Sequence, residues 1–421
     1  MKPISAFGIP LGISTSFWAL MGAIRFLIEI LSKKIRKQTL RRVRMKAKDI
    51  AVLVPAHNEE IVIRRNIQSL KQSFSPKQIY VVSDGSIDKT YRRARMEECH
   101  VSMLSPGKGK AKALLYLIKR FRIYKKYKLV FICDADNEID KTLIGRALPF
   151  FNDPQISVVF SASYTRWPHP FHPSLARYFI SYRYRLNRLL VYFYIYGQTW
   201  KHTNVNYVIP GSCTIYRSKV LKKLELDTPG LLIEDFNLAF QLHKRKLGKI
   251  GFHPSLISWE QYPHTLRDYW KQVRRWNIGF FQTVRKNGFW PSFFWLSMGT
   301  FSLEVFLNSL FITFLPIMVL FYIIPDLTNI HPIFNSVINL QKSSRLLSHI
   351  TIKGIFYSLF LFDYWMTAVV ATIHKKPQLL FYGIFFIFMH YVTSLILLTA
   401  VIPGFFSSSE GRWTSPTRRT I

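Results

Sequence analysis

The sequence predicts an α/β domain flanked by apolar helices that are long enough to cross a membrane, and three observations support this prediction. Short runs rich in Val and Ile alternate with helical patterns between Lys48 and Asn287. Apolar stretches of membrane-spanning length lie on both sides of that segment. A cluster of Lys and Arg directly follows the first of them, as is typical of the cytoplasmic side of a membrane anchor.

The composition combines a large positive charge with enough apolar content to bury a core. The 421 residues include 58 Lys and Arg against 23 Asp and Glu, for a net charge of +35. A hydrophobic content of 49% excludes a disordered basic tail protein and does not favour a wholly soluble enzyme. The excess of cations indicates an anionic partner, and nucleic acid, lipid headgroups and phosphorylated metabolites all qualify on charge. Cys99, Cys133 and Cys213 lack the number and spacing of a disulfide framework or a zinc cluster, which favours a reducing compartment.

The N-terminal apolar stretch runs from about Ile4 to Leu31 and is interrupted by Arg25 and Glu29. No small-residue cleavage site follows it, so we interpret it as an anchor and not as a signal peptide. About nine Lys and Arg follow the stretch, whereas only Lys2 precedes it. The positive-inside rule therefore places the middle of the chain in the cytoplasm.

Three further apolar stretches near the C-terminus are predicted spans: Phe301–Ile324, Gly354–Ile373 and Leu379–Ile402. They contain the ionisable residues Glu304, Asp363 and His390, for which we favour helix packing over substrate contact. The basic tail and the loop at His374–Lys376 both prefer the cytoplasm, so the number of crossings stays open. The run Pro291–Pro325 could also contain a second crossing or an interfacial helix. The predicted organisation is an anchor (1–31), a cytoplasmic domain (32–290), C-terminal helices (291–405) and a basic tail (406–421).

Four apolar runs in the cytoplasmic segment have the composition of strands buried on both faces: Ala51–Pro55, Gln78–Asp84, Leu129–Asp136 and Ile156–Ala162. Ile63, Ile67 and Leu70 recur at helical spacing between the first two runs, and Lys110–Lys119 also has helical composition. Alternation of this kind predicts a doubly wound α/β sheet.

Acidic and polar residues follow the predicted strands, at the edge where α/β sheets bind ligands. The first strand runs into Pro55–Glu60, the second into Ser83–Ser86 and the third into Asp134–Asp136. Any one of these groups alone is typical of a solvated turn or a helix cap. Together, in a chain of net charge +35, they indicate one site.

Three motifs give this site a chemistry. Asp134 and Asp136 are spaced to hold one hard cation that also binds a diphosphate. Glu234-Asp235 precedes a helical pattern, and a carboxylate outside the metal pair can act as general base on an incoming hydroxyl. About forty residues later, Arg275 can hold phosphate and Trp276 can stack on a sugar ring.

The ordered set VPAHNEE, SDGSIDKT, GKGKAKAL, CDAD, IED and QVRRW, followed by apolar spans, strongly resembles the membrane-integrated family 2 glycosyltransferases. That group includes the cellulose, chitin, hyaluronan and poly-N-acetylglucosamine synthases. The resemblance covers about Ala51 to Gln282. It implies a nucleotide-diphospho-sugar transferase (GT-A-like) fold, inversion at the anomeric carbon, and Mg²⁺ or Mn²⁺ as cofactor.

The resemblance also implies roles for individual residues. His57 matches an aromatic residue that lies against uracil, Glu59 and Asp84 match nucleoside-binding residues, and Lys110 matches a basic residue that meets the diphosphate. Asp134 and Asp136 match the pair that binds metal and diphosphate.

Asp235 matches the catalytic base, and Glu234 is its neighbour. Gln272, Arg275 and Trp276 match the motif that closes over the diphosphate and the acceptor end. The segment from Gly211 resembles the border of the acceptor site. Ser83 and His57 depart from the commonest residues of the family at their positions.

The segment Tyr164–Tyr207 is rich in Tyr and Arg. A nucleic-acid surface is the less favoured interpretation. We expect an interfacial helix whose rings lie at the level of the lipid headgroups and whose arginines reach phosphate. An alternative is that some of the rings flank the acceptor path.

The leading hypothesis is a polysaccharide synthase in the cell membrane that uses a UDP-sugar at a cytoplasmic site, extends its chain processively and exports it. The alternative is transfer of one sugar to a membrane lipid, because ceramide glucosyltransferases resemble this motif set as well. A remote alternative is an inactive membrane scaffold. We expect membrane lipids as partners and no nucleic acid. Sugar, linkage and oligomeric state do not follow from the sequence.

Overall fold

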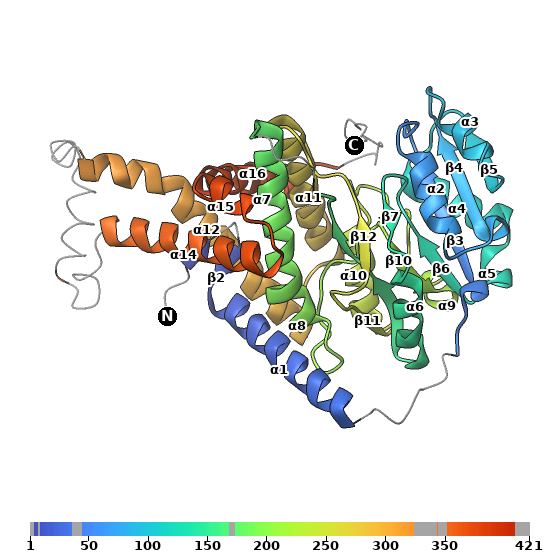
Figure 1. Ribbon diagram of the computed structural model, residues 1–421, viewed down its shortest axis with the longest axis horizontal. Helices are drawn as coiled ribbons and strands as arrows, with labels where there is room; N and C mark the ends of the chain where they lie inside the picture. Colours follow the sequence, from blue (N-terminus) through green and yellow to red (C-terminus); the bar gives the residue numbers. More distant parts are fainter. Residues whose placement is uncertain are drawn as a thin grey trace. The chain divides into compact units, whose positions relative to one another are not determined.

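The structure is a computed structural model that describes residues 4–6, 9–35, 44–167, 173–323, 343 and 352–408 (Figure 1). The chain divides into two compact units. The larger unit comprises Phe17–Met298 and Ala400–Ile421, and the smaller comprises Met1–Ser16 and Gly299–Thr399. The predicted basic tail beyond residue 408 and most of the basic cluster at 36–43 lie outside the described residues.

The larger unit is built on a seven-stranded sheet of order β11-β8-β10-β6-β3-β4-β5. Its strands are β3 (Ile50–Ala56), β4 (Ile79–Asp84), β5 (His100–Leu104), β6 (Leu129–Ile132), β8 (Ile156–Phe160), β10 (Thr214–Arg217) and β11 (Lys249–Gly251). All four predicted strands are present, as β3, β4, β6 and β8, although β6 and β8 end before the predicted Asp136 and Ala162. The sheet is mixed, because β10 runs antiparallel to both β6 and β8.

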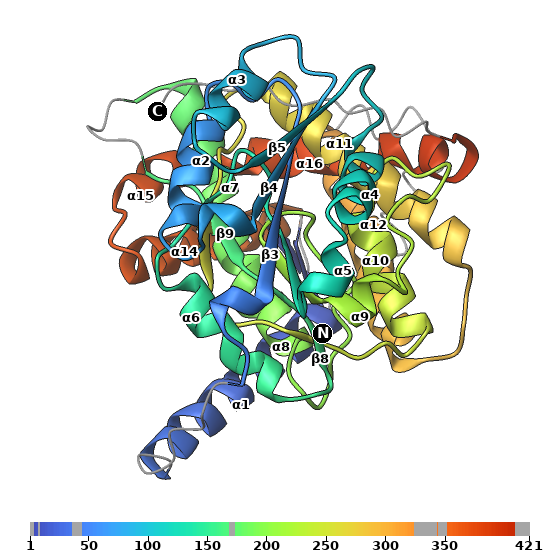
Figure 2. The ribbon, with the colours of Figure 1, turned by 90° about the vertical axis from the view of Figure 1, so that its right-hand side faces the viewer.

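Helices cover both faces of this sheet, as predicted for a doubly wound domain. Ile50, Val52 and Val54 point to the face covered by α2 (Ile63–Lys71) and α6 (Leu143–Ala147). The alternate residues Ala51 and Leu53 point to the face covered by α4 (Lys110–Arg120), α9 (Ser218–Leu221) and α10 (Asp235–Lys244). Figure 2 shows α2 and α4 on opposite sides of β3 and β4. Each buried Val, Leu or Ile contributes about 1.5–3 kcal/mol, so this two-faced core fixes the strand ends on which the site lies.

The larger unit also contains a second sheet of three short strands in the order β7-β12-β9, which was not predicted. Its strands are β7 (Glu138–Ile139), β12 (Ile257–Trp259) and β9 (Ala162–Tyr164). The other helices of the larger unit are α3 (Thr90–Arg95), α5 (Ile123–Lys126), α7 (Leu175–Leu190), α8 (Tyr196–Gln198) and α11 (Leu266–Asn287), with helical turns at Ala47–Asp49, Pro76–Gln78, Leu148–Asn152 and Val191–Ile195.

The predicted interfacial helix is wrong for much of the Tyr164–Tyr207 segment. Tyr182, Tyr184 and Arg185 of α7 and Tyr194 after it are buried in protein. Tyr182 packs edge-on against Tyr269 of α11, with ring centres 5.9 Å apart. The sequence pattern of alternating Arg and Tyr fits a headgroup region and an interior of stacked cations and rings equally well. In the structure, these arginine and tyrosine side chains lie in the protein interior.

Three helices of the described chain are long and apolar enough to cross a membrane: Ile13–Ser32, Phe293–Ile317 and Phe386–Phe406. They lie in α1 (Ile13–Ile35), α12 (Phe293–Ile323) and α16 (Phe386–Phe406). The first begins later than predicted, because β1 (Ile4–Ala6) and β2 (Ile9–Leu11) form a hairpin before it. The predicted span Leu379–Ile402 is divided between α15 (Gln378–Gly383) and α16, and α14 (Ile352–Ile373) has a shorter apolar stretch. In the described part of Pro291–Pro325, one continuous helix replaces the second crossing considered above.

The ionisable residues of the predicted spans make helix-packing contacts within the smaller unit, as expected. Glu304 of α12 accepts a hydrogen bond from the backbone N–H of Ser14 at 2.9 Å and so caps the start of α1. Gly12 permits this approach, because a Cβ there would lie 2.8 Å from the Glu304 carboxyl carbon. Asp363 of α14 lies 2.9 Å from His390 of α16, and both side chains are buried.

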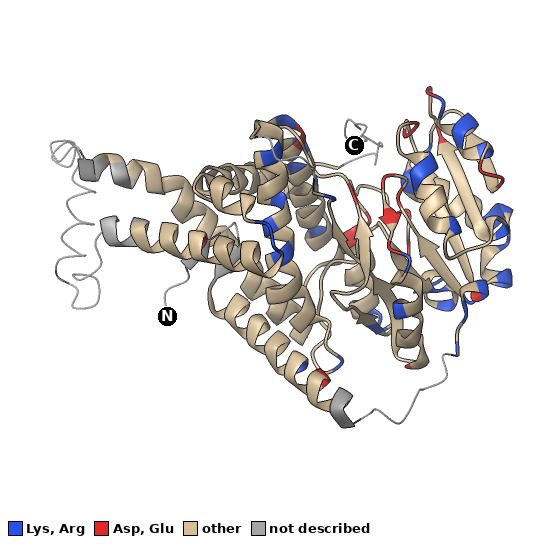
Figure 3. Cartoon of the chain, in the orientation of Figure 1, with Lys and Arg blue, Asp and Glu red and all other residues tan. Residues whose placement is uncertain are grey.

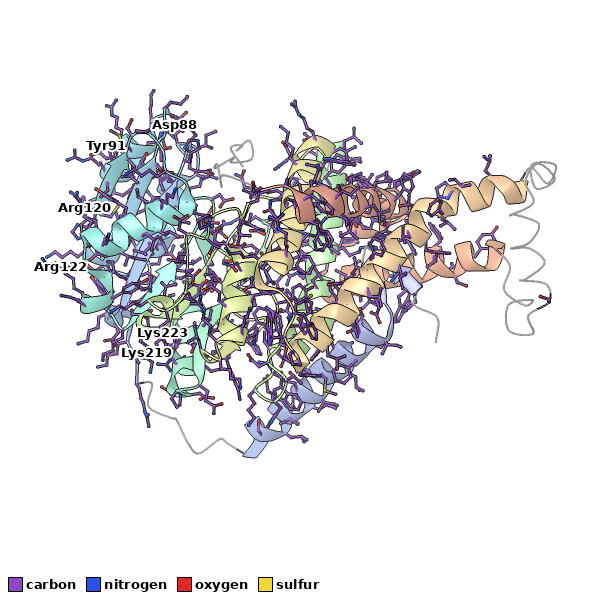
Figure 4. The ribbon with its side chains drawn as sticks, turned by 180° about the vertical axis from the view of Figure 1, so that it is seen from behind. Asp88, Tyr91, Arg120, Arg122, Lys219 and Lys223 are labelled. Atoms are coloured by element: carbon purple, nitrogen blue, oxygen red, sulfur yellow. The ribbon has the colours of Figure 1, made fainter. Side chains whose placement is uncertain are left out.

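Many Lys and Arg residues lie on the outer helices of the larger unit, whereas acidic residues also occur in the segments between its strands (Figure 3). Figure 4 shows Arg120, Arg122, Lys219 and Lys223 projecting from its outer surface, and all four are exposed. These four cations are therefore solvated.

Candidate active site

Asp134, one of the predicted strand-end acids, and Glu234 of the second acidic motif meet at one lysine. Lys110 is the first residue of α4, and its Nζ atom lies 3.0 Å from Oδ1 of Asp134 and 3.0 Å from Oε1 of Glu234. Asp134 follows β6, and Glu234 directly precedes α10. Two motifs separated by a hundred residues of sequence therefore meet at one ammonium group.

Asp84, at the end of β4, holds the loop that carries Lys110. Its buried carboxylate accepts hydrogen bonds from the backbone N–H groups of Lys108 at 2.8 Å and Gly109 at 2.7 Å. Gly109 has φ of 91°, a conformation that costs glycine nothing and strains other residues. The nucleoside contact expected of Asp84 stays a prediction, and its structural role is to position the start of α4.

His57 and Glu59 lie beside Asp84 at the ends of β3 and β4. The Nδ1 atom of His57 is 2.6 Å from the backbone oxygen of Asp84, which fixes the ring against the end of β4. Glu59 is buried, and its backbone N–H donates to Oγ1 of Thr90 at 2.8 Å. The three residues expected to bind the nucleoside therefore come together in the structure.

Lys110, Asp134, Glu234 and Asp235 together form the Lys110 cluster. The pKa values of Glu234 and Asp235 in this cluster are shifted in opposite directions. Burial raises the pKa of Glu234, but the charge of Lys110, hydrogen bonds from the backbone and from Lys110, and the charge of Arg275 together outweigh burial and leave that pKa below its usual value. Burial and the neighbouring charge of Glu234 raise the pKa of Asp235 to about 7, although Lys110 opposes them. A carboxyl group with a pKa near the working pH is suited to accept a proton from a hydroxyl. Of this acidic pair, Asp235 therefore has the properties of a base.

Gly211 is a site residue that the sequence motifs identified only as part of a segment. Its backbone N–H forms a hydrogen bond with Asp235, and a Cβ at this position would lie 2.6 Å from Nζ of Lys110 and 3.1 Å from Oε1 of Glu234. Its contact with Oδ1 of Asp235 would be closer still. Only a residue without a side chain lets Asp235 and Lys110 both approach this position.

The three motif residues on α11 have different neighbours. The charge of Arg275 lowers the pKa of Glu234, which places this guanidinium on the acidic side of the site. The ring of Trp276 lies under the guanidinium of Arg183 of α7, at 4.7 Å. Oε1 of Gln272 is buried and accepts no hydrogen bond from the described residues. The role of Arg183 was not predicted, because nothing in the local sequence relates α7 to α11.

Asp134 and Asp136 fit a divalent cation that is shared with a diphosphate. Their oxygens are the hard ligands that Mg²⁺ and Mn²⁺ prefer. Burial raises the pKa of Asp134, and the charge of Asp136 raises it further, so a cation between them would relieve this repulsion. No group of three or more His, Cys, Asp or Glu residues in the described chain is arranged to hold a metal ion. Phosphate and water oxygens would therefore complete the coordination.

The fold has a counterpart among solved structures. A mannosyltransferase from Pyrobaculum calidifontis, solved in complex with GDP-Man and Mn²⁺, aligns with a TM-score of 0.51 over 93% of this chain and 99% of its own, at 14% identity. The mixed sheet and its acidic edge thus define a GT-A-like nucleotide-sugar transferase fold.

The family follows from the sequence comparison. Residues 47–279, more than half of the chain, match the glycosyltransferase-like family 2 model, and the chain belongs to this family. A probable glycosyltransferase of Bacillus subtilis, YdaM, is 28% identical over 243 residues, which cover 55% of this chain and 54% of that protein. The poly-β-1,6-N-acetyl-D-glucosamine synthase of Staphylococcus epidermidis is 23% identical over 252 residues, covering 58% of this chain and 57% of that protein. The chain thus matches little more than half the length of these relatives.

Proposed function

We propose that this glycosyltransferase is a membrane-embedded polysaccharide synthase that transfers a sugar from a UDP-sugar to the hydroxyl of a growing chain, with inversion. The observation that carries the proposal is the position of Asp235, a carboxyl group with a pKa of about 7 beside Gly211 and the Lys110 cluster. The similarity to poly-β-1,6-N-acetyl-D-glucosamine synthases supports a polymer as acceptor.

In this mechanism Asp235 takes the proton of the acceptor hydroxyl. The acceptor oxygen forms a bond to the anomeric carbon from the face opposite the diphosphate, while the bond between that carbon and the phosphate oxygen breaks. The proton ends on Asp235 and the electron pair of the broken bond leaves with UDP. Lys110 and Arg275 carry the positive charges that stabilise the leaving diphosphate.

Other groups bind and orient the substrates. His57, Glu59 and Asp84 form the nucleoside side of the site, and Trp276 supplies a flat face to the acceptor. Asp134 and Asp136 would hold Mg²⁺ or Mn²⁺, which neutralises charge on the diphosphate when bound. Gln272, in the same motif as Trp276, offers a buried amide oxygen.

The candidate spans support a location in the cell membrane. The basic cluster that follows the first of them supports a cytoplasmic catalytic unit. Processive extension and export through the spans complete the proposal, because the acceptor motif on α11 lies directly before α12 in the chain.

The test uses purified full-length protein in lipid bilayers, incubated with a panel of UDP-sugars that includes UDP-N-acetylglucosamine, with Mg²⁺ or Mn²⁺. We expect one UDP-sugar to be consumed and to give water-soluble polymer whose length stays high when donor is limiting. Recovery of singly glycosylated lipid alone would replace the polymer with a lipid acceptor. Absence of transfer from every UDP-sugar would contradict the proposed function altogether.

A further inference from the structure

Gln282 is a buried residue of α11, six positions after Trp276, and the proposed mechanism gives it no role. Both ends of its side-chain amide are hydrogen-bonded to backbone groups. Oε1 accepts from the N–H of Leu232 at 2.8 Å, and Nε2 donates to the oxygen of Ser407 at 3.4 Å. One amide on α11 therefore joins two segments that are distant in the sequence.

The first of these segments leads directly into the proposed base. Leu232 precedes Asp235 by three positions, and residues 231–234 form neither a helix nor a strand. The position of this stretch therefore depends on its contacts with neighbouring elements. The side chain of Ile233 packs so closely on Gly279 of α11 that it fills the space where a Cβ would lie. Thus α11 contacts both the backbone and a side chain of the stretch that ends at the base.

The second segment is the C-terminal end of α16, which belongs to the larger unit together with α11. Arg285 of α11 donates to the backbone oxygens of Phe405 at 2.5 Å and Ser407 at 3.2 Å. Carbonyl groups at the end of a helix lack partners within it, and α11 supplies donors to them. A Cβ on Gly404 would lie 2.5 Å from Cβ of Phe281, so the end of α16 also packs directly against α11.

We propose that Gln282 is a positioning residue for the base, and that the end of α16 sets the position of Asp235 through it. The two hydrogen bonds use opposite ends of one planar amide, so a displacement of Ser407 would move the atom that holds Leu232. A base must lie within hydrogen-bond reach of the hydroxyl that it deprotonates, and a shift of about 1 Å can cost a hundredfold in rate. The inference rests on the proposed function, because Asp235 is the base of that reaction.

The first experiment compares Gln282→Met with Gln155→Met, which changes an exposed glutamine. Gln282→Met keeps the length of the side chain and removes both hydrogen bonds. In full-length protein in lipid, it should lower the single-turnover rate with UDP-N-acetylglucosamine by about tenfold to a hundredfold and leave the donor KM and the affinity for UDP unchanged. Gln282→Glu keeps an oxygen that can accept from Leu232, and should recover part of the rate. Gln155→Met should match the unmodified protein in all three measurements.

The second experiment moves the end of α16 without changing Gln282. The Cβ added by Gly404→Ala would force α16 away from Phe281, whereas a Cβ on Gly299 meets no atom within 4 Å, which makes Gly299→Ala the control. Hydrogen exchange at the backbone N–H of Leu232, measured without substrate, reports on the link independently of transfer. Exchange should be faster in Gln282→Met and in Gly404→Ala than in the unmodified protein, and transfer by Gly404→Ala should also be slower.

The two readouts separate the failure of this inference from the failure of the proposed function. If the unmodified protein transfers no sugar, the proposed function fails, and normal exchange at Leu232 in both variants would overturn the link as well. Normal turnover in a folded Gln282→Met protein would overturn the positioning role, even if exchange is faster. Normal exchange in Gly404→Ala would overturn the part assigned to α16. A loss of donor affinity equal to the loss of rate in Gln282→Met would also contradict a role that acts through the base.

Discussion

The guanidinium carbon of Arg183 lies 4.7 Å from the centre of the Trp276 ring, so that α7 covers one face of the aromatic residue expected to meet the acceptor. The same guanidinium lies 5.9 Å from the ring of Tyr262. Asn187, one turn later on α7, donates to the hydroxyl of Tyr262 at 2.7 Å. The two side chains of α7 therefore contact Trp276 and Tyr262 together, and we expect Arg183 to position Trp276 for the acceptor.

The first prediction is that Arg183→Met weakens acceptor use without weakening donor use. A cation over an indole contributes about 0.5–2 kcal/mol, which corresponds to an increase in acceptor KM of about twofold to thirtyfold. Arg183→Lys should restore part of the loss, because it restores the cation. Exposed Arg120→Met is the matched control. The measurement is acceptor KM and product length beside the rate of UDP-sugar hydrolysis, and an equal loss in both reactions would contradict a positioning role.

Asp235→Asn should reduce transfer by about 10²–10⁴ while UDP binding persists. The change removes the base and leaves Asp134, Asp136 and Lys110 in place. Asp227→Asn, at an exposed position of the same region, should transfer at the normal rate. Single-turnover rates and UDP titrations check both variants. Near-normal turnover in Asp235→Asn would show that another group accepts the proton.

Gly211→Ala should abolish most of the activity and leave the fold intact. The added Cβ would lie 2.6 Å from Nζ of Lys110, and closer to the Asp235 carboxylate, so the base and the lysine must move apart. Gly145→Ala is the control, because a Cβ there meets no atom within 4 Å. Transfer rates and thermal unfolding of both proteins test this prediction. Wild-type activity in Gly211→Ala would mean that the close approach of these groups is not needed for catalysis.

Metal removal should stop both donor binding and turnover, because the carboxylates of Asp134 and Asp136 would then face a diphosphate of like charge. Excess chelator is expected to silence the enzyme, and added Mg²⁺ or Mn²⁺ to restore it. Asp136→Asn should require a higher metal concentration for half-maximal activity. Full turnover in chelator, with both metals shown to be absent, would remove the cation from the mechanism.

The parts of the fold that the sequence predicted are those with a local signal. β3, β4, β6 and β8 are apolar runs, and the acids that follow β3, β4 and β6 could be assigned to one edge from the topology of parallel strands. β10 escaped prediction because four residues that include Thr, Tyr and Arg do not have the pattern of a buried strand. β10 pairs antiparallel with β6, and this pairing brings Gly211, which precedes β10, to the site. The position of Gly211 therefore depends on a pairing between two segments that are distant in the sequence.

The contacts of α7 also could not be predicted from a local sequence pattern. Arg and Tyr alternate along this helix, and each Arg can lie over a ring in the protein interior or reach a lipid phosphate. The choice depends on whether other helices cover α7, and that is a property of the tertiary structure. Burial of Arg185 and the stacking of Arg188 over Tyr164 at 3.4 Å decide it for the interior.

The last prediction concerns the pair Asp363 and His390 in the smaller unit, whose Oδ1 and Nε2 atoms lie 2.9 Å apart. Both side chains are buried, on α14 and α16, and such polar groups are costly unless they are paired. Asp363→Ala or His390→Ala alone leaves the partner buried without this contact and should lower the free energy of unfolding by about 3–5 kcal/mol. The double change Asp363→Leu with His390→Phe should recover most of that loss, because both polar groups are removed together.

Thermal unfolding of the four proteins in lipid, with exposed Thr399→Ala as control, gives the stability comparison. Product length then separates packing from a role in the path of the polymer. If the pair only joins α14 to α16, the stable double variant makes polymer of normal length. If the growing polysaccharide passes along Asp363 and His390, the double variant is stable but makes short products. An apolar surface then replaces the hydrogen-bond partners of the polysaccharide. Single variants as stable as the unmodified protein would contradict the packing role that the 2.9 Å contact indicates.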